Sequence, residues 1–418
     1  MEMTKQNVHT ADVHIALKSP RVNAILFMAM IALILFTALQ YVFPGVGPGA
    51  LPMKDYDAFF VAGRMFWEGR LEDAYFAETL IAAQAEILGV QSFMPWTYPP
   101  HFIVVTAMLS LVPVWLGYAL FTGLTLLFYL IMLRNITPGL FTVVIIFTFP
   151  AALICIRTGQ NGFLIAGLIA YFILNIEHSK VRASASLALL SFKPHFLPLM
   201  YLLAALRRQT LVILGGLFGT ALLLISASLI FGFGIWPAFQ NSVNESGIFL
   251  REGFYPLFRM TSLYAALHTL GAPPNIAFVA QILLALTAIG AVLLAKIKSW
   301  PRHQLLATAV MGSLFISPYA YDYDLQILGV ALALLMQDLW IKASAKQLLI
   351  LLAGCWLSSA SVFFSWSEES SLSELHNEHL ALNFWFLISI CLYSLWIART
   401  GLQHDATRKS RPEGGLSV

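Results

Sequence analysis

The sequence has little charge for its length. Only 11% of the 418 residues are Asp, Glu, Lys or Arg, while 59% are apolar, whereas a soluble domain carries about 25% charged residues. The mean hydropathy is +0.78. These values exclude a soluble enzyme and a disordered chain, and the net charge of +3 is too small to indicate a nucleic acid partner. The fold class that remains is an all-α polytopic membrane protein.

Cysteine and nucleotide-binding motifs are also scarce. The three cysteines, Cys155, Cys355 and Cys391, lie inside apolar runs without a CxxC spacing, so neither a disulfide framework nor a metal cluster is expected. The chain has no GxxxxGK[ST], no GxGxxG after a strand and no HExxH. An ATP-driven pump and a cytosolic nucleotide-sugar enzyme are therefore disfavoured, and no cofactor is expected.

Long apolar runs dominate what is present. A helix needs roughly 20 apolar residues to cross the hydrocarbon core. The candidate crossings are Asn23–Phe43, Trp115–Leu133, Gly139–Ile156, Phe163–Ile176, Leu211–Phe233, Ile276–Ala295, Leu305–Ile316, Leu325–Leu339, Leu348–Trp366 and Leu382–Ile397. Three shorter runs, His101–Val112, Ala183–Phe192 and Phe196–Leu206, are typical of broken or re-entrant helices. If His101–Val112 does not cross fully, about 12 transmembrane helices remain.

Basic residues indicate the orientation, because cytoplasmic loops are enriched in Lys and Arg. They cluster before the first helix, in four connecting loops and after the last helix, so both termini (1–22 and 399–418) are expected to be cytoplasmic tails. The outer segments are then Pro44–Pro100, Arg157–Gly162, Gly234–Asn275, Ser317–Asp324 and the acidic Ser367–His379. In the first outer loop, residues 44–100, the spacing predicts short amphipathic helices over Ala58–Glu68 and Leu71–Leu88, lying on the outer membrane surface. We expect one membrane-embedded domain over residues 1–418.

Two carboxylates follow the first crossing directly. Asp55 and Asp57 lie where a carboxylate can act as a general base on a sugar hydroxyl. Helix capping is the favoured alternative for Asp57. For Asp55, a solvated loop charge and a catalytic role are evenly balanced.

Three cations of the expected outer face are candidate phosphate ligands. Arg157 lies on the outer face against the usual charge bias, which a phosphate group would explain, although a plain turn needs no function. Lys193 lies in an apolar hairpin, where an ammonium is costly without a partner, and snorkelling is the alternative. Arg259 follows in the long outer loop, where most charges are ordinary solvated ones.

Further polar and aromatic residues are candidate substrate ligands. For Tyr98 the alternative is the interfacial belt of aromatic residues, and for the amides Gln160 and Asn161 it is an ordinary turn. For Tyr319 and Asp322 it is an interfacial tyrosine cluster in which Asp324 caps the next helix. The candidates are Tyr98, Gln160, Asn161, His195, Tyr319 and Asp322.

In this order, these segments resemble glycosyltransferase family 87, the polyprenol-phosphate-dependent mannosyltransferases of the GT-C superfamily. The resemblance extends from about Asp55 to Asp324. Its pieces are Asp55 to Arg64, Gly69, Tyr75, Trp96 to Pro100, Gly159 to Gly162, Phe192 to Pro194 and Ser317 to Asp324.

The resemblance implies a membrane-embedded, inverting glycosyltransferase of GT-C type. Its donor would be a sugar, most typically mannose, on decaprenyl or undecaprenyl phosphate, and its acceptor a lipid or glycan. The site would face the periplasm from the bacterial cytoplasmic membrane. The family's presumed base falls on Asp55, and Asp57 is an extra acid that leaves an alternative open.

Other functions are compatible with the same sequence. One alternative is a transporter or flippase of polyprenyl-linked sugars, and another is a non-catalytic subunit of an envelope-assembly complex. The sugar can also be arabinose or glucose instead of mannose. Although no metal is expected, a cation shared by Asp55, Asp57 and Asp322 stays open.

Overall fold

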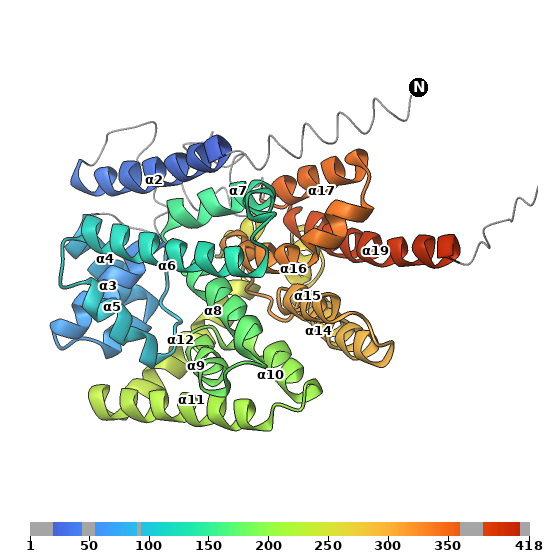
Figure 1. The fold of residues 1–418 in the computed structure, drawn as a ribbon. Coiled ribbons are helices and arrows are strands. Elements are labelled where there is room, and N and C mark those ends of the chain that lie inside the picture. Colours follow the sequence, from blue (N-terminus) through green and yellow to red (C-terminus); the bar gives the residue numbers. More distant parts are fainter. Residues whose placement is uncertain (1–19, 44–54, 90–92, 360–378, 410–418) are drawn as a thin grey trace, which may run out of the picture.

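The computed structural model describes residues 20–43, 55–89, 93–359 and 379–409 (Figure 1). Within these ranges every regular element is helical, and the one isolated β-bridge joins Met260 to Tyr321. The α-helices are α2 (Pro20–Val42), α3 (Tyr56–Trp67), α4 (Ala77–Leu88), α5 (Ile103–Leu109), α6 (Val114–Ile136), α7 (Phe141–Thr158), α8 (Gly162–Asn175), α9 (Lys180–Leu190), α10 (Leu197–Leu206), α11 (Thr210–Phe231), α12 (Ile235–Arg251), α13 (Leu263–Thr269), α14 (Pro274–Ile297), α15 (Arg302–Ser313), α16 (Gln326–Lys342), α17 (Ala345–Leu357) and α19 (Asn383–Lys409). The 3₁₀ turns are η1 (Glu72–Tyr75), η2 (Pro100–Phe102), η3 (Pro194–Phe196), η4 (Leu257–Arg259) and η5 (Asp322–Leu325).

Six of the described helices are long and apolar enough to cross a membrane. They are Arg21–Val42, Val114–Ile136, Phe141–Thr158, Thr210–Phe231, Pro274–Ile297 and Asp322–Lys342. Helix α8 has 14 residues, or about 21 Å at 1.5 Å per residue, which is less than the roughly 30 Å hydrocarbon core. The structure is thus that of an all-helical membrane protein with six full-length candidate spans, and the number of about 12 crossings stays a prediction.

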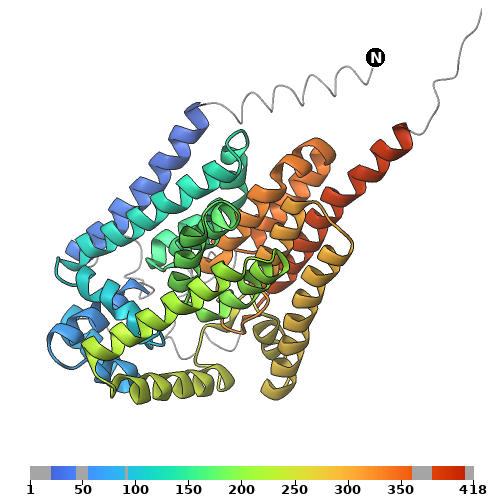
Figure 2. The same cartoon turned by 60° about the horizontal axis from the view of Figure 1, so that its bottom comes forward.

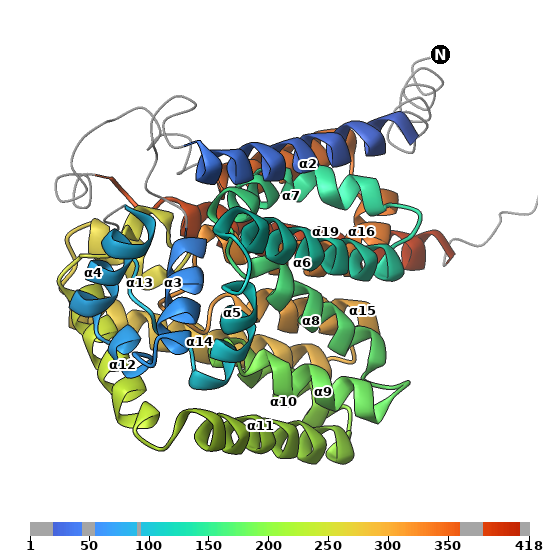
Figure 3. The same ribbon diagram turned by 90° about the vertical axis from the view of Figure 1, so that its left-hand side faces the viewer.

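The candidate spans divide into a buried centre and an exposed periphery. In α7 and in the span that contains α16, 78% and 72% of the residues are buried inside the protein, compared with 11% in α11 and 17% in α14. Helices α2 and α11 lie along opposite edges of the molecule (Figures 1 and 3). The apolar side chains of these outer helices are exposed, as expected for surfaces that face lipid.

The helices of the first outer loop differ from their predicted setting. Helix α3 forms as expected, but the second predicted helix is divided at Phe76 into η1 and α4. Of the residues from Tyr56 to Met65, all but Arg64 are buried, and α3 packs against α4 and α5. The apolar face of α3 packs against other helices of the protein, and Arg64 and Trp67 near its end are exposed.

Helices α3, α4, α12 and α13 gather at one end of the molecule (Figure 3). The start of α2 and the end of α19 lie at the opposite end (Figure 2), which agrees with two termini on the same side. The acidic segment Ser367–His379 lies outside the described residues except for His379, as do residues 1–19 and 410–418 of the terminal tails and residues 44–54 of the predicted first outer loop.

Candidate active site

One cavity of about 280 Å³ lies beside the start of α3 and helix α12, at the ends of the buried spans α7 and α16. Its walls come from seven regions of the chain: the start of α3, the loop before η2, the α7–α8 turn, the segment that leads into η3, helix α12, the segment that leads into η4, and the segment before α16. It is lined by Asp55, Phe93, Met94, Pro95, Thr97, Tyr98, Gln160, Phe192, Lys193, Pro194, His195, Val243, Ser246, Tyr255, Pro256, Arg259, Tyr319, Tyr321 and Tyr323.

Asp55 is a buried carboxylate in the wall of this cavity. The side chain is 5% exposed, and its Oδ1 atom accepts no hydrogen bond within the described part of the chain. Burial raises the pKa of Asp55 to about 6, against the opposing effects of the Arg259 guanidinium and the Gln160 amide. A carboxylate that takes up a proton near neutral pH has the acidity that general-base chemistry needs.

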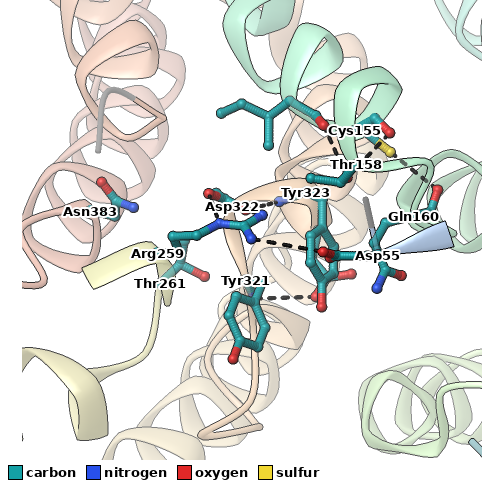
Figure 4. A network of polar contacts seen from close by, with 12 residues as sticks. Asp55, Cys155, Thr158, Gln160, Arg259, Thr261, Tyr321, Asp322, Tyr323 and Asn383 are labelled. Carbon is teal, nitrogen blue, oxygen red and sulfur yellow. Dashed lines mark hydrogen bonds and ion pairs between the residues drawn. The ribbon is translucent and has the colours of Figure 1, made fainter. Parts of the chain in front are cut away.

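Arg259 lies between two carboxylates (Figure 4). Its Nε and Nη2 atoms each donate to Asp322 over 3.0 Å, to Oδ2 and Oδ1 respectively, and its Nη1 lies 4.0 Å from Oδ1 of Asp55. Burial alone would lower the pKa of Arg259, but Asp322 and Asp55 raise it above the ordinary value. Arg259 therefore stays charged and occupies the position that a cation shared by Asp55 and Asp322 would need.

Lys193 forms the second buried ion pair of the site. Its Nζ donates to Oδ1 of Asp324 over 2.7 Å, and the side chains are 7% and 0% exposed. The same ammonium lies 4.7 Å from the centre of the Tyr323 ring. Asp324 also accepts a hydrogen bond from the backbone N–H of Tyr321, so the carboxylate both caps the η5 turn and holds the lysine.

Two glycines of the α7–α8 turn bring these parts together. Gly159 ends α7 with φ +65°, and a Cβ there would lie 2.7 Å from the Cβ of Tyr56. A Cβ on Gly162 would lie 2.0 Å from the carbonyl oxygen of Tyr323. Because neither position can hold a side chain, the backbone passes close to α3 on one side and to η5 on the other.

Aromatic rings form much of the remaining wall. The Tyr98 hydroxyl donates to Oε1 of Gln160 over 3.0 Å, and the Tyr98 ring lies edge-on to Phe59. Tyr321 and Tyr323 stack on each other at 5.2 Å. Aromatic faces beside a few polar groups suit the apolar and hydroxyl faces of a sugar ring.

Seven of the residues that the sequence nominated line this cavity: Asp55, Tyr98, Gln160, Lys193, His195, Arg259 and Tyr319. Four others do not. Asp322 lies directly behind Arg259, and Asn161 is fully buried beside Gln160, with neither side-chain polar atom hydrogen-bonded to a described residue. Asp57 accepts a hydrogen bond from the Tyr41 hydroxyl over 2.6 Å. Arg157 donates to Gln40 of α2, away from the cavity wall.

The structure adds residues that sequence reasoning did not nominate. The sequence indicated that the carboxylates and tyrosines of Ser317–Asp324 suit carbohydrate binding, but it nominated only Tyr319 and Asp322, with helix capping as the alternative for Asp324, and it gave Tyr255 no role. The signal available was the Asp-Tyr-Asp run at residues 322–324, which places two carboxylates two positions apart. Nothing in the sequence paired them with Arg259 and Lys193.

A sequence comparison identifies the protein family. The model of glycosyltransferase family 87 matches residues 96–318, more than half of the chain. None of the curated proteins or solved structures compared with the chain matches it. The matched region includes Lys193 and Arg259, whereas Asp55 lies 41 residues before it and the Asp322 to Asp324 segment begins four residues after it. With this match and its apolar helices, the chain is a membrane glycosyltransferase and belongs to glycosyltransferase family 87.

Proposed function

We propose that the protein transfers a sugar, most typically mannose, from a polyprenyl-phosphate donor to a hydroxyl of a lipid or glycan acceptor. The proposal is carried by one observation. A buried carboxylate oxygen without a hydrogen-bond partner in the described chain, Oδ1 of Asp55, lines the cavity that two buried cations also line. This combination supplies a proton acceptor and a phosphate-binding environment within one small volume.

Asp55 would act as the general base. The acceptor O–H gives its proton to Asp55 as the oxygen attacks the anomeric carbon, and the bond from that carbon to the phosphate oxygen breaks. A single displacement inverts the anomeric centre. Because Asp55 has a pKa of about 6, it is ionised at neutral pH and still basic enough to accept the proton.

Lys193 and Arg259 would stabilise the leaving group. A sugar on a polyprenyl phosphate is a phosphodiester with one negative charge, and departure leaves a phosphomonoester with more. Cations fixed where this charge develops lower the barrier without rearranging. An ammonium has three N–H donors and Asp324 takes one of them, so the others remain for phosphate oxygens.

Asp324 and Asp322 would act as positioning residues. Each holds one of the two cations through a direct ion pair, at 2.7 Å and 3.0 Å. With Asp55 ionised, three carboxylates face two cations and one negative charge is left over, whereas a proton on Asp55 makes this set of groups neutral. A pair of cations already fixed by carboxylates loses little side-chain entropy when the phosphate binds.

The outer face of the bacterial cytoplasmic membrane is the proposed location of the site. The cavity is lined by residues from the start of α3, from η4 and from the segment before α16. Helix α3 lies at the end of the molecule opposite to the start of α2 and the end of α19 (Figure 2). The basic clusters beside those helix ends favour a cytoplasmic position for them. A donor in the outer leaflet could then place its phosphate in the cavity.

A transfer assay tests this function. The purified protein in lipid nanodiscs is given decaprenyl-phosphate [¹⁴C]mannose and a membrane extract from cells that lack the protein as acceptor pool. Label should move to a new product, and the Asp55→Asn variant should not support this transfer. Glucose and arabinose carriers are assayed in parallel to identify the sugar.

Two results would contradict the proposal. If no carrier gives a product, the polyprenyl-phosphate donor is wrong. If the protein in sealed liposomes moves the labelled carrier between leaflets and forms no product, the flippase alternative replaces it.

A further inference from the structure

A second cavity, of about 820 Å³, lies far from the candidate active site. It forms a groove between α2 and α6, and the start of α7 closes one end of it. Figures 1 and 3 show α2 lying along α6 and α7 at the edge of the molecule. The groove therefore opens on a surface of exposed apolar side chains.

The groove is apolar along its length and polar at one end. Helix α2 contributes Phe27, Met30, Ile31 and Ile34, and α6 contributes Gly123, Leu126, Leu127, Leu130 and Ile131. Because the two helices run antiparallel, the first turns of α2 meet the last turn of α6. Asn23, Arg134 and Thr142 lie together there.

The length of the groove matches one leaflet. Asn23 and Ile34 are eleven positions apart on one helix, which corresponds to about 16 Å at 1.5 Å per residue. Half of the hydrocarbon core is about 15 Å thick. An acyl chain whose head group lies beside Asn23 would therefore extend to Ile34.

The polar end has donors suited to an anion. The guanidinium of Arg134 is exposed, and no carboxylate in the described part of the chain forms an ion pair with it. The Thr142 hydroxyl donates to Oδ1 of Asn23 over 2.6 Å, so the Asn23 amide nitrogen remains a donor for another acceptor. Among the residues that line the groove there is no Asp or Glu.

We propose that this groove binds one anionic phospholipid of the leaflet at the α2 start, the cytoplasmic leaflet in the orientation described above. One acyl chain fills the groove between α2 and α6, and the phosphate lies against Arg134 and the Asn23 amide. The site is separate from the cavity that contains Asp55. The other end of helix α2 contacts α3, where Tyr41 donates to Asp57.

Native mass spectrometry of the full chain tests the proposal. The protein is delipidated in detergent and titrated with phosphatidylglycerol or phosphatidylcholine of identical acyl chains. The unmodified protein should retain one phosphatidylglycerol and prefer it to phosphatidylcholine by about fivefold, the effect expected from one basic residue at a membrane surface. Arg134→Gln should abolish this preference, whereas Arg182→Gln, at an exposed arginine outside the groove, should preserve it.

A second pair of variants tests the acyl-chain position. A Cβ added at Gly123 meets no atom within 4 Å, and the same holds at Gly290 on α14. Gly123→Phe should fill the groove and reduce retention of both lipids, whereas Gly290→Phe should leave retention unchanged. Equal retention of the two lipids by the unmodified protein, or full retention by Gly123→Phe, would overturn the proposal. If Gly123→Phe does not fold, the comparison of Arg134→Gln with Arg182→Gln decides.

Discussion

Lys193 and Asp324 are 131 positions apart in the sequence, yet the ammonium and the carboxylate are 2.7 Å apart and buried. The lysine extends from the turn between α9 and η3, and the aspartate belongs to the η5 turn that opens α16. Lys193 also lines the candidate active site, whereas Asp324 lies behind it. This one ion pair thus holds the start of α16 in place and also positions a cation in the wall of the cavity.

Replacing Lys193 by Gln should weaken donor binding. Removing one partner of a buried pair typically costs about 3–5 kcal/mol of stability, because the other charge is left unpaired. The single variant should therefore lower both the melting temperature and the affinity for the donor, measured as KM for the polyprenyl-phosphate sugar.

The double variant Lys193→Gln with Asp324→Asn separates these two effects. Without either charge, stability should return toward that of the unmodified protein, whereas donor KM should stay high. If donor KM recovers together with stability, Lys193 is structural and does not bind phosphate.

Asp55→Asn should reduce turnover by about 10²–10⁴-fold, the usual effect of removing a general base. The amide retains the shape of the side chain but cannot accept the proton. Donor binding should persist because Lys193 and Arg259 are unchanged. Single-turnover rates and donor affinity, measured on the same preparation, distinguish a loss of catalysis from a loss of donor binding.

Asp57→Asn is the matched control for that experiment. Asp57 bonds to Tyr41 and does not line the cavity, so its replacement should cost about 1–2 kcal/mol of stability with little effect on turnover. If Asp57→Asn abolishes transfer and Asp55→Asn does not, the base has been assigned to the wrong carboxylate.

The pH dependence of kcat/KM should report Asp55. A general base works only when ionised, so the rate should rise through pH about 6, the pKa to which burial raises Asp55, and level off above it. Arg259 lowers the pKa of Asp55. In Arg259→Gln, the rise of kcat/KM with pH should therefore occur at a higher pH than in the unmodified protein. If the pH of this rise is unchanged, Asp55 is not the titrating group.

Gly159→Ala should destabilise the protein and reduce activity. The residue has φ +65°, and the added Cβ would lie 2.7 Å from Tyr56, so a loss of about 1–3 kcal/mol is expected from overpacking. Gly247→Ala is the control, because its Cβ would meet no atom within 4 Å in helix α12. That variant should be about 0.5–1 kcal/mol more stable than the parent. Thermal unfolding of both variants in one detergent checks the difference.

The orientation can be tested by cysteine labelling of intact cells. The exposed residues Asn244 on α12 and Lys180 at the start of α9 are separated by the span α11. A membrane-impermeant maleimide should label Asn244→Cys and leave Lys180→Cys unlabelled, because Lys180 belongs to a basic loop. The reverse pattern would place the cavity at the cytoplasmic face.

The sequence predicted most of the helices because apolar runs and their breaks carry that information locally. Helices α6, α7, α11 and α14 begin and end within a few residues of the predicted runs. The turn after α7 was predicted as well, because Gly159 and Gly162 are strong local signals. The enclosure of α3 was not predicted, since the same apolar spacing suits a membrane surface and a protein interior.

The pairing within the candidate site could not be predicted in the same way. Asp55, Arg259 and Asp322 come from three segments, and no local pattern states which cation meets which carboxylate. Sequence chemistry nominated Lys193 for a phosphate, whereas the structure gives it Asp324 as a partner. Arg157 was predicted to bind a phosphate because arginine is unusual on the outer face of the membrane, but in the structure it contacts Gln40.

The distance along the chain between Lys193 and Asp324 also matters during synthesis. The ribosome adds about 5–20 residues per second, so the lysine is made on the order of 10 s before its carboxylate. During that interval the hairpin that contains Lys193 lacks its counterion, and a bare ammonium in the membrane is costly. Stable burial of this hairpin therefore begins only when the start of α16, with Asp324, has been synthesised.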